Sequence, residues 1–179
     1  GEEAIRALHD KMGEGFRNFK WKVGVEAPVE EQAIFERLVD GLPSDVRFRL
    51  DANGGWSQEV MTDWLDFLKR WGDRIEYVEQ PLAPGGEREM LSARADSGIE
   101  IALDESLNGG EGVRCMDAWP GVLVVKAPLM GDFGSLINRL RPLSERVVLS
   151  SVFETGVGLL NSLALADALP EMNRALGFD

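Results

Sequence analysis

Five short strand-like segments of this chain each end in a charged residue, and these residues recur at intervals of 22 to 29 positions. The five are, in chain order, Lys22, Asp51, Glu79, Asp104 and Lys126. One acid at the end of a strand is an ordinary loop residue. Three acids on successive segments, with lysines on the segments at either side, indicate a site that performs chemistry.

The three acids suit a divalent metal ion. Carboxylates gathered at one place repel and raise one another's pKa values, and a cation offsets that repulsion. Ligands that are all oxygen favour Mg²⁺, with water and substrate completing the octahedron, and Mn²⁺ is the alternative ion. Because His9 is the only histidine and Cys115 the only cysteine, a zinc site built from these residue types is not expected.

The lysines predict proton transfer. Strand alternation puts Lys20 and Lys22 on one face and Trp21 on the other. Lys126 follows the apolar run 122–125, where a cation is otherwise unexpected. Clustered cations and a nearby metal can depress the pKa of an amine until it acts as a base near neutral pH. We therefore expect these lysines to move a proton next to a substrate carboxylate.

Other polar residues have two interpretations each. Arg49 lies on the same strand face as Asp51, where it either forms an interior salt bridge or reaches a substrate carboxylate. Ser150, Ser151 and Gly156 follow the last apolar run, where they either hydrogen-bond substrate or cap the next helix. A Ser-His-Asp nucleophile is not expected, because the only histidine, His9, lies on the first expected helix and not at a strand end.

Strand-like and helix-like segments alternate along the whole chain, which predicts parallel strands joined by right-handed crossovers. The expected strands are residues 18–23, 47–51, 75–79, 100–104, 122–126 and 147–151. The expected helices are residues 2–12, 29–40, 58–71, 87–96, 110–116, 133–143 and 157–169.

The alternation predicts an α/β fold of the (β/α) TIM-barrel type. In such a barrel the carboxyl ends of all strands meet at one mouth, so the five charged residues would converge. A complete eight-fold barrel takes about 200 residues or more, so about six units in 179 residues predict an incomplete barrel, forming one domain over residues 1–179. A doubly wound open sheet is the alternative, weakened by the absence of a G-x-G-x-x-G turn after the first strand.

Composition limits the partners. A formal net charge of −12 argues against nucleic acid, which requires a basic surface. The sequence has no apolar run of roughly 18 residues, so a membrane partner is not expected. A single cysteine excludes an intramolecular disulfide and fits the reducing cytoplasm.

Five motifs stand in the order found in the enolase superfamily. They are Lys20-Trp21-Lys22, Asp51-Ala52-Asn53, Glu79-Gln80-Pro81, Asp104-Glu105-Ser106 and Lys126-Ala127-Pro128. K-x-K on one strand and a later strand-end lysine resemble the muconate-cycloisomerase-like subgroup. Within it, residues 150–158 are most similar to the family of o-succinylbenzoate synthases of menaquinone biosynthesis. The resemblance covers essentially the whole chain.

The resemblance implies a role for each residue. Asp51, Glu79 and Asp104 would hold Mg²⁺ in an enzyme of the lyase class. Lys22 would remove the proton α to the carboxylate of a small-molecule substrate, and Lys126 would stabilise the enediolate. Lys20 would tune Lys22. A proton from Lys22 would then reach the departing hydroxyl, giving a net syn loss of water.

Two other functions remain open. An N-acylamino acid racemase or dipeptide epimerase of the same subgroup would use Lys22 and Lys126 to exchange a proton on opposite faces of the substrate. The family also carries an N-terminal α+β capping domain that closes over the substrate, and nothing in this chain corresponds to it. The third interpretation is therefore a non-catalytic fragment, whose missing partner is the capping domain or the rest of the parent chain.

Overall fold

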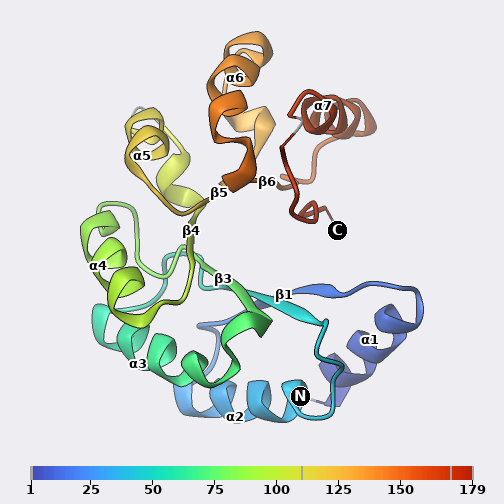
Figure 1. The fold of residues 1–179 in the computed structure, drawn as a ribbon, viewed down its shortest axis with the longest axis vertical. Helices are drawn as coiled ribbons and strands as arrows, with labels where there is room; N and C mark the ends of the chain where they lie inside the picture. The colour runs from blue at the N-terminus through green and yellow to red at the C-terminus, as the bar shows by residue number, and fades with distance from the viewer. Residues whose placement is uncertain (1, 110, 170, 179) are drawn as a thin grey trace. The chain divides into compact units, whose positions relative to one another are not determined.

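The computed structural model describes residues 2–109, 111–169 and 171–178. Within them the chain alternates strands and helices as the sequence predicts (Figure 1). The strands are β1 Asn18–Lys22, β2 Arg47–Asp51, β3 Ile75–Glu79, β4 Ile101–Leu103, β5 Val122–Val125 and β6 Val147–Leu149. The helices are α1 Glu2–Gly13, α2 Pro28–Val39, α3 Gln58–Leu68, α4 Glu87–Ser97, α5 Gly112–Ala118, α6 Phe133–Leu140 and α7 Gly156–Asp167. The chain divides into two compact units, residues 1–101 and 102–179.

The first unit contains strands β1, β2 and β3, which are parallel and ordered as in the sequence. Lys22 lies opposite Asp51, and Asp51 lies opposite Glu79, so three charged residues end neighbouring strands side by side. Helices α2 and α3 lie next to each other against these strands (Figure 1). The register therefore sets the positions of the charged residues.

An aromatic cluster holds the first unit together. The ring of Phe35 on α2 is fully buried and stacks on Trp21 of β1 with centroids 5.3 Å apart. Phe48 of β2 and Trp71 meet the same ring edge-on, each at 5.3 Å. Because Trp21 faces the helices, strand alternation turns Lys20 to the opposite face, as predicted.

The second unit contains β4, β5 and β6, also parallel and in chain order. All four residues of β5 and all three of β6 are buried, as is typical of parallel strands covered on both faces. Gly177 continues the ladder beyond β6, since its N–H donates to the carbonyl of Leu149 at 2.8 Å. Helices α5, α6 and α7 follow the three strands in turn.

Four boundaries differ from the prediction because the chain turns into a short 3-10 helix, and β6 ends at Leu149 instead of including Ser150 and Ser151. These helices are η1 Lys69–Arg74, η2 Glu105–Leu107, η3 Ala127–Leu129 and η4 Arg141–Arg146. Asp104 and Lys126 consequently lie directly after β4 and β5 rather than inside them. Gly110, which the sequence analysis placed at the start of a helix, lies outside the described residues. The single domain over residues 1–179 stays a prediction.

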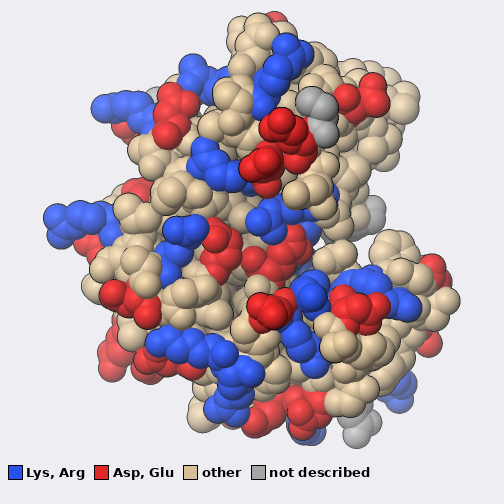
Figure 2. All heavy atoms as spheres, in the orientation of Figure 1, with Lys and Arg blue, Asp and Glu red and all other residues tan. Residues whose placement is uncertain are grey.

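The surface and the helices add two observations. Acidic and basic side chains are interspersed over the face drawn in Figure 2. No helix in the described part of the chain is both long and apolar enough to cross a membrane.

Replacing Phe35 tests the aromatic cluster. We expect Phe35→Ala to lower the free energy of unfolding by about 3–5 kcal/mol, because it removes a buried ring and leaves a cavity. Urea denaturation followed by circular dichroism measures the change. The control is Phe16→Ala, since Phe16 is 54% exposed, and it should cost less than about 1 kcal/mol. Equal losses in the two variants would contradict the assignment of Phe35 to the core.

Candidate active site

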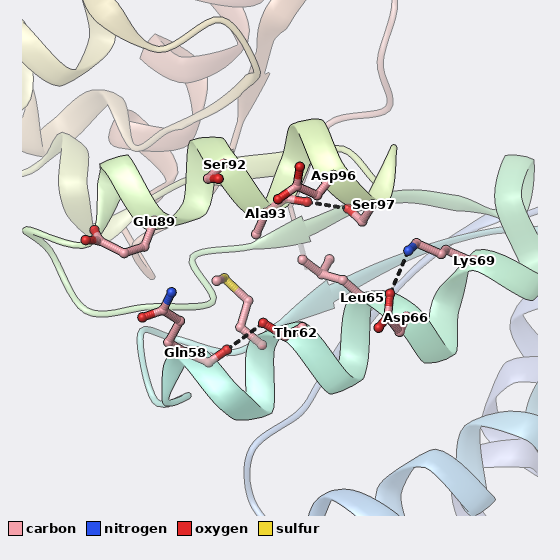
Figure 3. Close-up of a pocket in the computed structure, with 11 residues that line it drawn as sticks. Gln58, Thr62, Leu65, Asp66, Lys69, Glu89, Ser92, Ala93, Asp96 and Ser97 are labelled. Carbon is pink, nitrogen blue, oxygen red and sulfur yellow. Dashed lines mark hydrogen bonds and ion pairs between the residues drawn. The ribbon is translucent and has the colours of Figure 1, made fainter.

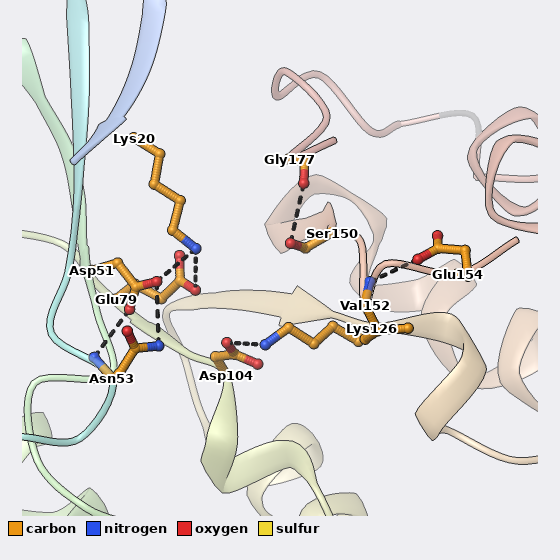
Figure 4. Close-up of polar contacts among 10 residues, drawn as sticks. All are labelled: Lys20, Asp51, Asn53, Glu79, Asp104, Lys126, Ser150, Val152, Glu154 and Gly177. Carbon is orange, nitrogen blue, oxygen red and sulfur yellow. Dashed lines mark hydrogen bonds and ion pairs between the residues drawn. The ribbon is translucent and has the colours of Figure 1, made fainter. Parts of the chain in front are cut away.

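At the carboxyl ends of β1 to β3, one ammonium group joins two buried carboxylates (Figure 4). Lys20 Nζ lies 2.8 Å from Asp51 Oδ2 and 2.9 Å from Glu79 Oε1. Asp51 is 5% exposed and Glu79 only 1%. Burial lowers the pKa of the Lys20 ammonium, but Glu79 and Asp51 outweigh burial and hold that pKa above its ordinary value.

This arrangement fits a cation site. The ammonium of Lys20 stands where the oxygens of Asp51 and Glu79 converge, so it shows a point that a positive charge can occupy. Two hard oxygen ligands suit Mg²⁺. Within the described residues, however, no three His, Cys, Asp or Glu side chains are arranged to hold a metal ion. The three-carboxylate site therefore stays a prediction.

The turns after β2 and β3 carry backbone strain next to these carboxylates. Asn53 has φ 46° and Gln80 has φ 38°, a region that side chains rarely adopt and that costs on the order of 1–3 kcal/mol. The N–H of Asn53 donates to Asp51 Oδ1 at 3.0 Å. The N–H of Gly54 donates to the carbonyl of Gln80 at 2.7 Å, which ties the two turns together. Such strain persists only where surrounding contacts hold the backbone in place. The backbone next to the two carboxylates is therefore preorganised.

In the second unit, a further lysine and acid pair with each other. The ammonium of Lys126 forms an ion pair with Asp104 Oδ2 (Figure 4). Asp104 is 1% exposed, and the side chain of Lys126 is 19% exposed. Both residues follow their strands directly, as the sequence analysis expects of site residues.

The loop after β6 is organised by Glu154 (Figure 4). Its carboxylate accepts from the N–H of Val152 at 2.7 Å and from the hydroxyl of Ser151 at 3.0 Å. The Val152 amide, followed by the backbone N–H of Glu154, keeps the pKa of this carboxyl below its ordinary value. Ser150 donates its hydroxyl to the carbonyl of Gly177 at 3.2 Å. Gly156 is the first residue of α7.

Arg49 adopts the interior salt bridge, one of its two predicted interpretations. Its guanidinium donates to both oxygens of Glu76, at 2.7 and 3.1 Å, and lies over the ring of Tyr77. The side chain of Arg49 is 5% exposed. Burial lowers the pKa of this guanidinium, but Glu76 reverses that effect and raises it. Contact with a substrate carboxylate stays a prediction for Arg49.

Lys22 ends β1 as an exposed residue, in register with Asp51. Two acids that organise the surroundings, Glu31 and Glu76, were not predicted from the sequence. A faint signal existed for Glu31, because an acid in the first turn of a helix is well placed to accept backbone N–H groups. No comparable signal marked Glu76, since its partner is 27 residues away.

A separate cavity of about 120 Å³ lies between helices α3 and α4 (Figure 3). Its polar side chains are engaged locally: Lys69 pairs with Asp66 at 2.6 Å, and the hydroxyl of Ser97 donates to the carbonyl of Ala93 at 2.7 Å. It is lined by outer helices rather than strand ends, and we assign it no function.

Comparison with known proteins shows the family to which this chain belongs. The family model described as "Enolase C-terminal domain-like" matches residues 3–125. The chain belongs to this family.

Two curated relatives and one solved structure show which members of the family this chain is similar to. The chain is 42% identical over 162 residues to an o-succinylbenzoate synthase of Thermosynechococcus vestitus, covering 88% of this chain and 50% of that protein. It is 34% identical over 180 residues to an o-succinylbenzoate synthase of Thermobifida fusca, covering 98% and 55%. A crystal structure of o-succinylbenzoate synthase from Thermosynechococcus elongatus BP-1, complexed with Mg in the active site, matches with a TM-score of 0.86 and 40% identity, covering 99% and 57%.

These comparisons confirm the predicted fold class and the resemblance. The fold is α/β, with parallel strands and helices matching part of the TIM-type barrel domain of the enolase superfamily. The chain spans about half the length of the curated relatives it matches.

The ion pairs of Lys20 predict a loss of stability when its charge is removed. We expect Lys20→Met to lower the free energy of unfolding of the metal-free protein by about 2 kcal/mol, because two buried carboxylates lose their cation. This is less than for a fully buried pair, since the side chain of Lys20 is 39% exposed. Urea denaturation in EDTA measures it. Lys11→Met is the control, because the Lys11 pair with Glu14 is exposed; a similar loss in both variants would count against the interaction.

The lowered pKa of Glu154 predicts a pH dependence. A carboxyl whose folded pKa lies below its unfolded value of about 4.3 contributes stability that is present above that value and lost as pH falls through the folded pKa. We expect Glu154→Gln to be less stable than wild type at pH 7 and to approach the stability of wild type as the pH falls through the folded pKa of Glu154. Thermal unfolding at several pH values tests this, with exposed Glu171→Gln as control. A constant difference at every pH would rule out the carboxylate as the cause.

Proposed function

We propose that this chain is the barrel part of a Mg²⁺-dependent lyase that makes o-succinylbenzoate. The enzyme removes the proton α to a substrate carboxylate and completes a syn loss of water. The observation that carries the proposal is the convergence of Asp51 and Glu79 on one positive charge at the ends of neighbouring strands. Similarity to two o-succinylbenzoate synthases supports the choice of reaction.

The metal would be held by Asp51, Glu79 and Asp104. When bound, it supplies positive charge that offsets the charge developing on the substrate carboxylate. The chemistry of the donor set supports Mg²⁺, with Mn²⁺ as a substitute of similar ligand preference.

The lysines carry the proton. Lys22 takes the α-proton from carbon, and the electron pair left behind moves onto the carboxylate as an enediolate. Lys126 offsets this negative charge with its ammonium. The enediolate then collapses, the hydroxyl on the neighbouring carbon leaves, and Lys22 returns the proton to it as water. Lys20 lies two residues before Lys22 on the same strand face, where its charge tunes that amine.

Polar groups near the strand ends bind the substrate. Ser150, Ser151 and the amide of Gly156 hydrogen-bond the substrate, and Arg49 supplies positive charge from the interior. The substrate is a small carboxylate molecule rather than a nucleic acid or membrane lipid. An α+β capping domain, or the rest of a parent chain, completes the enclosure, and the enzyme works in the cytoplasm.

Turnover separates this proposal from the racemase or epimerase alternative. The chain is incubated with Mg²⁺ and the hydroxylated cyclohexadiene carboxylate that loses water to give o-succinylbenzoate, and aromatic absorbance is followed. We expect Lys22→Ala and Lys126→Ala to lower kcat by about 10²–10⁴-fold, and Lys69→Ala to leave it unchanged. Racemisation of N-acylamino acids or dipeptides without water loss would instead establish the alternative.

Metal titration tests the site independently of turnover. We expect Mg²⁺ to stabilise the chain against urea by about 2.7 kcal/mol at a concentration of 100 Kd. Asp51→Asn should abolish this gain, while the exposed control Asp66→Asn should retain it. Stability that does not respond to Mg²⁺ in any variant would refute the metal site in this chain. Stabilisation without turnover would favour the non-catalytic fragment.

A further inference from the structure

The loop that leaves β1 wraps around a buried carboxylate. Glu31, in the first turn of α2, is 4% exposed. Its oxygens accept from three successive backbone N–H groups: that of Gly24 at 2.8 Å, of Val25 at 2.9 Å and of Glu26 at 3.0 Å. One side chain therefore fixes the path of a whole loop.

A carboxylate offers two acceptor oxygens to these three donors, whereas the amide of a glutamine would offer one. A buried charge is unfavourable unless it is hydrogen-bonded, and three consecutive N–H groups form a concave site suited to an anion. In the described part of the chain Glu31 makes no ion pair with lysine or arginine, so backbone dipoles balance its charge. The partial positive charge at the N-terminus of α2 also helps to balance the charge of the Glu31 carboxylate.

The loop is also fixed from two other sides. The N–H of Val23 donates to the carbonyl of Asp51 at 2.9 Å, and Val23 is 2% exposed. Gly24 has φ 81°, and a Cβ at this position would lie 3.1 Å from the indole nitrogen of Trp56. Lys22 is the last residue of β1 and directly precedes this loop, so its backbone is held by the strand on one side and by the loop on the other, while its side chain is exposed.

We propose that Glu31 is a positioning residue for Lys22. Its carboxylate holds the backbone of residues 24–26, and this keeps the Lys22 amine in the same position from one turnover to the next. This inference rests on the proposed function, in which Lys22 takes the α-proton. A misplacement of a catalytic group by about 1 Å can lower the rate on the order of 10²-fold. Loosening the loop that follows Lys22 should therefore lower kcat.

The chain offers a matched pair of variants. Glu31→Gln and Glu30→Gln remove the same charge from neighbouring positions, but Glu30 is exposed and its side chain does not hold the loop. In Glu31→Gln we expect amide hydrogen exchange of Gly24, Val25 and Glu26 to accelerate at least tenfold. We expect kcat to fall about 10- to 100-fold, with KM within threefold of wild type. Glu30→Gln should match wild type in each measurement.

The result that overturns the proposal is faster exchange in Glu31→Gln with an unchanged kcat, or a rise in KM alone. If Glu31→Gln does not fold, Gly24→Ala replaces it, because its Cβ disturbs the same loop from the Trp56 side; unchanged kcat there is equally decisive against the proposal.

Absence of turnover in wild type would refute the proposed function and leave a separate measurement for Glu31. The ¹³C signal of reductively dimethylated Lys22 is then compared among the variants. A signal that moves in Glu31→Gln but not in Glu30→Gln supports positioning of Lys22. A signal unchanged in both overturns it.

Discussion

The first unit depends on one constraint: two neighbouring carboxylates are almost completely shielded from solvent. Asp51 and Glu79 lie opposite each other on adjacent strands and are almost completely buried. Without a cation between them, their repulsion and their loss of hydration would oppose folding. The ammonium of Lys20 supplies that charge in the structure. A site that must be neutralised by a cation is also a site that can bind one.

The surroundings convert this electrostatic requirement into a fixed geometry. The stacked ring of Trp21 on Phe35 anchors β1 to the helices and turns Lys20 toward the acids. The strained turns at Asn53 and Gln80 are tied by hydrogen bonds close to the carboxylates. Helices, strands and turns of this unit thus orient a small number of polar atoms.

Carboxylates that accept backbone N–H groups recur in both units: Glu31 is buried and Glu154 is partly exposed. Glu31 accepts three N–H groups of the loop after β1, and Glu154 accepts the Val152 N–H in the loop after β6. Each carboxylate orders a segment at the carboxyl end of a strand, where members of parallel α/β folds bind ligands.

The sequence by itself determined the order of the elements and which charged residues end the strands. Alternating apolar patterns are local, so β2 and β3 were predicted with the bounds they have. The spacing of the strand ends likewise predicts Asp51 and Glu79, and strand alternation predicts that Lys20 faces away from Trp21. Only the tertiary structure decided the partners: Arg49 bonds to Glu76 and Glu31 holds the loop beyond Lys22. The Arg49–Glu76 pair joins residues 27 positions apart and depends on how the strands pack, so it leaves no periodic signal in the sequence. The hydrogen bonds of Glu31 span only five to seven positions, but they depend on the path of the loop, which no periodic pattern encodes.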